Sequence, residues 1–143
     1  MRLDEAIQAS YNDLIESMKN ANLIQGEGSE NNIDDIFFWN MSIKKLERSK
    51  SKLYFIYNII DCAPQGYADN IIVSRVARFE VIMYSKEPIY SPTNKKVLEN
   101  LNKSFLKNNW SFEISSQPYY NIENQMYIYD FEVEKFYANN WYW

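Results

Sequence analysis

Hydrophobic residues recur every three or four positions in two segments of the chain. In the first segment they are Leu3, Ile7, Tyr11, Leu14 and Met18. This spacing predicts a helix from Leu3 to Ala21 with one buried face. The second segment opens with Ser91 and Pro92, a capping hydroxyl followed by proline, and its apolar stripe predicts a helix from Pro92 to Lys107.

Elsewhere the pattern is that of β-strands. Five segments are rich in aromatic and branched residues: Ile36–Ile43, Leu53–Ile60, Ile71–Tyr84, Trp110–Ile114 and Met126–Phe136. Pro64 and Gly66 punctuate the interval between the second and third segments, which predicts an antiparallel pair joined by a long loop. The order of elements predicts an α+β fold: a mainly antiparallel sheet with two helices packed on one face.

Charged residues alternate with hydrophobic ones in the last predicted strand. Asp130, Glu132 and Glu134 fall on one face together with Ile128. The other face carries Tyr127, Tyr129, Phe131 and Val133. The strand Ile71–Tyr84 has apolar residues on both faces and charges in its middle. We therefore expect one face of the sheet to meet the core and the other to meet something else, such as another subunit.

The length bounds the number of domains. A chain of 143 residues and 17.1 kDa is enough for one compact domain, here 1–143, and we do not expect two full domains. We divide it into an N-terminal part (1–52), a core (53–137) and an aromatic C-terminal tail (138–143). Aromatic residues make up 17% of the chain, which favours ring-packed strands.

The absence of histidine removes the usual general base and the usual imidazole metal ligand. Cys62 is the single cysteine, and the three glycines form no phosphate-binding loop. Glu80, Asp130, Glu132 and Glu134 could supply the paired carboxylates of a glycosidase, but a solvated or interface-facing row is favoured. We therefore expect no enzymatic activity, no catalytic residues, no cofactor and no metal.

Charge and hydropathy limit the partners. The net charge is -4 and the pI about 4.9, which argues against a non-specific nucleic-acid binder. The acidic segment 22–35 lacks the spacing of a calcium loop, and the basic segment 44–52 is short and contains Glu47, so both are interpreted as solvated. No apolar run approaches the roughly 20 residues of a membrane helix and no signal peptide is visible, so we expect a soluble protein made in the cytoplasm, with no membrane partner.

Several short motifs in the last two-thirds of the chain resemble those of tail terminator, or tail completion, proteins of long-tailed bacteriophages. They are an aromatic strand (Tyr54–Asn58), a loop with a Tyr-Ala-Asp signature (Gly66–Asn70) and a strand that ends in an apolar-Tyr-Ser-Lys step (Arg78–Lys86). A helix (Asn94–Lys107) and a tyrosine-rich strand (Met126–Val133) follow in the same order. The N-terminal segment up to Ile43 is a larger lead-in than the compact members of that family have.

The resemblance implies a virion protein of the tail or neck, synthesised in the host cytoplasm. Such a protein assembles as a homo-oligomeric ring, commonly a hexamer, at the head-proximal end of the tail tube. The ring ends tube growth and joins head to tail. Its partners would be itself, the tail tube protein and the head completion or connector protein, and DNA would pass through without specific binding.

Candidate contact residues follow from this resemblance and from the strand pattern. The interface candidates are Tyr67, Asp69, Asn70, Arg75, Arg78, Trp141 and Trp143, and the candidates for lining the channel are Asp130, Glu132 and Glu134. The aromatic tail either folds back on its own domain or docks on a neighbour. The rival hypothesis is a small-ligand or peptide-binding α+β module without catalytic activity, which uses its aromatic surface for stacking.

Overall fold

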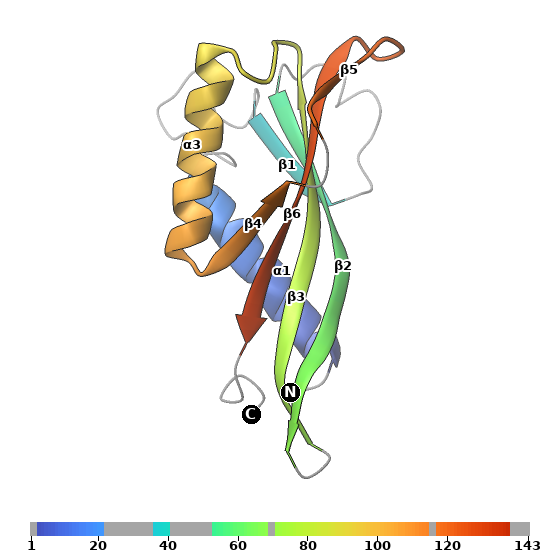
Figure 1. The fold of residues 1–143 in the computed structure, drawn as a ribbon, viewed down its shortest axis with the longest axis vertical. Helices are drawn as coiled ribbons and strands as arrows, with labels where there is room; N and C mark the ends of the chain where they lie inside the picture. The colour runs from blue at the N-terminus through green and yellow to red at the C-terminus, as the bar shows by residue number, and fades with distance from the viewer. Residues whose placement is uncertain (1–2, 22–35, 41–52, 69–70, 115–116, 138–143) are drawn as a thin grey trace.

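The structure is a computed structural model that describes residues 3–21, 36–40, 53–68, 71–114 and 117–137. It contains helices α1 (Leu3–Asn20) and α3 (Pro92–Lys107) and a six-stranded sheet (Figure 1). The strands are β1 (Ile36–Asn40), β2 (Leu53–Ala68), β3 (Ile71–Ser85), β4 (Trp110–Ile114), β5 (Tyr119–Asn121) and β6 (Met126–Tyr137).

The sheet is mainly antiparallel, as predicted. Its strand order is β1-β2-β3-β6-β4. β5 also pairs with β6, at residues 126–128, whereas β4 pairs with residues 131–135. β1 runs parallel to β2, and every other pair is antiparallel. The predicted α+β class is therefore confirmed.

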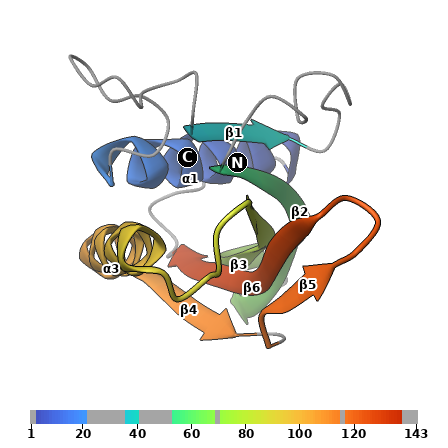
Figure 2. The same cartoon turned by 90° about the horizontal axis from the view of Figure 1, so that it is seen from above.

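Both helices pack on one face of the curved sheet (Figure 2). Strand alternation places Phe55, Phe79 and Phe131 on that face, and each is fully buried. Leu14 of α1 and Phe105 of α3 belong to the same core. A buried hydrogen bond joins the two helices, since the Ser104 hydroxyl donates to the Ser17 carbonyl oxygen at 2.6 Å.

The ends of α3 are set by local chemistry. The Ser91 hydroxyl accepts a hydrogen bond from the Asn94 amide at 3.3 Å, which caps the helix as predicted. Asn109 takes a left-handed φ of 66° just after the helix, a conformation that asparagine adopts more readily than most residues. The chain then turns directly into β4.

The prediction of a long loop after Ile60 is wrong, because β2 continues to Ala68. The register of β2 with β3 shifts near Ile59 and on both sides of Gly66, and these bulges let the strand continue through Pro64 and Gly66. Among the described strands, β1 pairs with β2 only as far as Tyr57, so beyond that point β2 has a free edge with respect to them, where Pro64 is tolerated. A short strand that the sequence pattern did not predict, β5, precedes the turn 122–125.

The N-terminal strand is partly tested. β1 covers Ile36–Asn40 of the segment predicted as a strand, and residues 41–43 lie outside the described residues. Within the described part of the chain, neither helix is long and apolar enough to cross a membrane.

Candidate functional site

Opposite the face on which α1 and α3 pack, the other face of the sheet gathers the charged residues of the strands; among the described elements it carries no helix, and we call it the helix-free face. In the register of β3 and β6, Glu80 lies opposite Glu132 and Arg78 lies opposite Glu134. Asp61 of β2 lies opposite Arg78 on its other side. We call this surface the acidic face, and its residues are Asp61, Arg78, Glu80, Asp130, Glu132 and Glu134.

Arg78 is the cation of the acidic face. Its Nε lies 3.6 Å from a carboxylate oxygen of Glu134 and 3.8 Å from one of Asp61. All three side chains are more than a third exposed, and such ion pairs contribute only about 0–1 kcal/mol. Arg78 therefore only weakly neutralises the carboxylates at one end of the acidic face. The middle of the acidic face keeps an excess of carboxylates.

Glu80 lies in that middle. Burial raises the pKa of the Glu80 carboxyl, and the Asp130 carboxylate raises it further by its charge and by a hydrogen bond with the protonated carboxyl. Glu132 adds a smaller effect of the same sign. Like charges directly opposite one another on neighbouring strands destabilise a sheet. A cationic group of another molecule would therefore bind favourably at this part of the surface, because it would reduce the repulsion between the carboxylates.

The other end of the same face is apolar. Tyr54 and Tyr84 stack with ring centroids 4.8 Å apart, and Ile56 and Met126 are buried with them. This small cluster is separate from the main core beneath the helices. The helix-free face is thus divided into an apolar end near β5 and an acidic face further along the strands.

The structure brings the three predicted channel residues together. Asp130, Glu132 and Glu134 share one face of β6, as the alternation predicts, and Arg78, a predicted contact, lies beside them. Glu80 joins them through the register of β3 with β6. That register is a tertiary property, so the pattern within a single strand does not reveal it.

Arg75 does not lie on the surface with Arg78. Its side chain is only 6% exposed, and its Nη1 donates to the carbonyl oxygen of Cys62 at 2.7 Å. Because β3 alternates, Arg75 falls on the helix-covered face. Its position inside the subunit gives it a structural role and does not support the predicted contact.

Tyr67 lies near the end of a projecting hairpin. In the described residues β6 pairs with β3 only as far as Arg75, and residues 71–74 continue the pairing with β2. We call the paired segments 64–68 and 71–74 the hairpin arm, which forms the narrow lower end of the molecule in Figure 1. Tyr67 is 65% exposed there. The predicted contacts Asp69, Asn70, Trp141 and Trp143 lie outside the described residues.

A second polar cluster lies on the helix-covered face. The Tyr137 hydroxyl donates to Asp13 Oδ2 at 2.5 Å, and Lys135 Nζ lies 3.3 Å from the same oxygen. Burial and the Asp13 carboxylate raise the pKa of the Tyr137 hydroxyl far above its ordinary value, so it keeps its proton. Sequence reasoning did not single out Asp13, because only the packing of α1 on β6 gives it partners.

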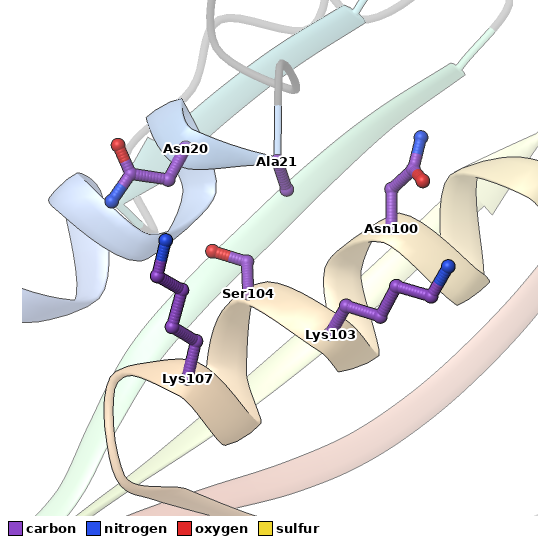
Figure 3. A pocket seen from close by; sticks show the side chains of 6 residues that line it. All are labelled: Asn20, Ala21, Asn100, Lys103, Ser104 and Lys107. Carbon is purple, nitrogen blue, oxygen red and sulfur yellow. The ribbon is translucent and has the colours of Figure 1, made fainter.

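A shallow cleft of about 280 Å³ lies between α1 and α3 (Figure 3). Its lining includes Asn20, Asn100, Lys103 and Lys107. The two lysines are cationic and the two asparagine side chains can donate hydrogen bonds, so the cleft is suited to contact a carboxylate. In the described ranges, no three cysteine, aspartate or glutamate side chains are placed to hold a metal ion.

Comparison with known proteins adds no assignment. No protein-family model matches the sequence, and a search of curated proteins finds no match. The function proposed below is therefore supported by the sequence motifs and by the surfaces described above.

Proposed function

We propose that the protein is a structural subunit of a bacteriophage neck. Its copies assemble into a ring, commonly six-fold in the family it resembles, at the head-proximal end of the tail tube. The ring ends growth of the tube and joins the tail to the head connector. Two of the motifs behind the resemblance, Tyr54–Asn58 and Arg78–Lys86, lie on the paired strands β2 and β3.

The observation that carries this proposal is the division of the sheet into two unlike faces. One face is covered by α1 and α3, whereas the other carries the acidic face, whose ionic side chains are partly exposed. The outward face of β3 also carries partly exposed apolar side chains, Ile82 and Tyr84, beside its charges, and a mixed apolar and charged face suits a subunit that meets neighbours through its sheet. Closed rings need such a surface on every copy.

The hairpin arm supplies a second kind of contact. It extends beyond the strands that flank it, and the exposed Tyr67 ring lies near its end. Exposed tyrosines are frequent anchors in protein interfaces, because they bury a large ring and keep a hydroxyl for hydrogen bonding. The arm is our candidate for the contact with the tail tube or the connector.

Substitution of Tyr67 tests this assignment. We expect Tyr67→Ala to fold and to keep its oligomeric state, while particles that carry it lose head–tail joining. Tyr90→Ala is the matched control, since Tyr90 is 67% exposed but lies outside the arm, just before α3. Equal infectivity of the two variants would show that the arm is not a contact.

The molecular mass of the protein in solution distinguishes a ring subunit from the rival hypothesis, a small-ligand or peptide-binding module. A ring subunit gives concentration-dependent oligomers in sedimentation velocity and a few copies per purified virion. A strictly monomeric protein that does not occur in particles would favour a small-ligand or peptide-binding module. The cleft between α1 and α3 would then be the first place to look for the ligand.

A further inference from the structure

The outer, solvent-exposed side of α3, which also borders the cleft with α1, carries a row of lysines opposite in charge to the acidic face. Lys96, Lys103 and Lys107 are all exposed, and at 100° per residue they fall within about 40° of one another around the helix. Leu101 and Phe105 point to the core on the opposite side. We call Lys96, Lys103 and Lys107 the basic strip.

The basic strip has no ionic partner inside the described part of the subunit. The ion pairs there involve Arg78 and Lys135, and none reaches α3. Glu99 is the one carboxylate of α3, so the outer side of this helix is net positive. These charges are therefore available to another molecule.

We infer that the basic strip of one copy docks on the acidic face of the next copy in the ring. This inference rests on the proposed ring and names the surfaces that form it. Neighbouring carboxylates in the middle of the face, Glu80, Asp130 and Glu132, repel one another. Lysine ammonium groups from a neighbouring helix would relieve that repulsion and would lie over the partly exposed carboxylates.

The two surfaces agree in length. Lys96 and Lys103 are separated by seven residues, or roughly 10 Å along the helix axis. Asp130 and Glu134 are separated by four residues, or roughly 13 Å along the strand. A helix laid along β6 can therefore bring both lysines to the carboxylates at once.

Exposed apolar residues flank the charges on both surfaces. Leu106 on α3 is 59% exposed, and Phe136, two residues beyond Glu134 on β6, is 60% exposed. Interfaces commonly join apolar anchors to charged residues, and the charges fix the register. Leu106 and Phe136 would meet when the lysines lie over the carboxylates.

The two surfaces also lie on different sides of the subunit. Figure 2 shows α3 at one side of the molecule, where it packs on the core face of the sheet, whereas strand alternation places the carboxylates of β3 and β6 on the opposite face. A contact between unlike surfaces of identical subunits is heterologous, and it closes into a ring when the rotation permits. This arrangement buries the acidic face between subunits, whereas the channel placement of Asp130, Glu132 and Glu134 leaves it facing DNA.

A charge swap tests the docking. We expect Lys103→Glu and Glu132→Lys each to weaken subunit association by about tenfold or more. The double variant K103E/E132K restores the attraction at every contact and should return association to within about threefold of the native chain. Sedimentation velocity at low and high salt measures these constants, and circular dichroism checks that each variant folds.

Matched controls isolate the effect of position. Lys86→Glu and Glu16→Lys change the same charges at exposed sites outside both surfaces and should leave association unchanged. Rings that form normally in both K103E and E132K would overturn the docking but leave the proposed function standing. If E132K formed normal rings and newly retained DNA, the channel placement would be correct and the docking wrong.

Cross-linking gives an independent readout. Cys62 is buried, so cysteines placed at residues 103 and 132 can be followed without interference. We expect a mixture of Lys103→Cys and Glu132→Cys chains to form intermolecular disulfides, and a mixture of Lys86→Cys and Glu132→Cys chains to form none. A native chain that stayed monomeric at all concentrations would instead contradict the ring itself.

Discussion

Glu80 and Glu132 lie directly opposite one another on the neighbouring strands β3 and β6. Asp130 also hydrogen-bonds with the Glu80 carboxyl and adds its charge. Two carboxylates in that position repel each other, and water solvates Glu80 only in part. The carboxylates in the middle of the sheet therefore lower the free energy of unfolding of the subunit and give it a charged surface.

Removal of the Glu80 charge should stabilise the subunit. Burial and Asp130 raise the pKa of Glu80 in the folded state, so the folded chain binds a proton at this carboxyl more readily than the unfolded chain. The free energy of unfolding therefore falls as pH rises from the ordinary pKa of glutamate through the raised one. We expect Glu80→Gln to gain about 0.5 kcal/mol at pH 7. The gain should shrink as pH falls toward 4, where the native carboxyl is protonated.

Urea unfolding at several pH values measures this effect. Glu123→Gln, at an exposed turn residue, is the control and should show no gain at any pH. A gain for Glu80→Gln that grew on acidification would contradict the assigned direction of the pKa shift.

Tyr137→Phe should weaken the contact between α1 and β6. The hydroxyl donates to the Asp13 carboxylate at 2.5 Å, and hydrogen bonds to charged groups contribute about 1.5–3 kcal/mol. We expect a loss of about 2 kcal/mol in thermal or urea unfolding, with faster amide exchange in α1. Tyr127→Phe is the control on the same face of β6, and its effect should stay within about 0.5 kcal/mol.

The two arginines of β3 should respond differently to substitution. Arg75→Met removes the buried donor to the Cys62 carbonyl oxygen and should destabilise the fold by about 1–3 kcal/mol. Arg78→Met removes only partly exposed ion pairs and should change stability by less than about 1 kcal/mol. Equal losses in chemical unfolding would show that Arg75 is not the structural arginine.

Asn94→Ala should loosen the junction of β3 with α3. Asn94 Nδ2 donates to Ser85 Oγ at 2.8 Å and to the Pro88 carbonyl oxygen at 2.9 Å, and the residue is buried. The variant loses both of these hydrogen bonds from a buried side chain and should lower stability by about 2 kcal/mol. Asn100→Ala, on the exposed side of the same helix, should have almost no effect on the midpoint of unfolding.

Local sequence signals predicted the helices and most strands well. Ser91, Pro92 and the apolar stripe gave the start of α3, and alternation in β6 gave the row that includes Glu132. The prediction failed between Ile60 and Ala68, where proline and glycine normally indicate a loop. Bulges and a free strand edge let these residues continue β2, and neither feature is visible without the neighbouring strands.

The sequence by itself determined the two helices, the two faces of β6 and the absence of histidine chemistry, because each depends on residue type and on spacing along one element. Only the tertiary structure decided that Glu80 lies opposite Glu132 and that Arg75 is buried while Arg78 is exposed. The hydrogen bond from the Tyr137 hydroxyl to the Asp13 carboxylate is likewise a product of the tertiary structure. These relationships join residues from different elements. They depend on strand register and on where each helix lies on the sheet, which are set by packing of the whole core.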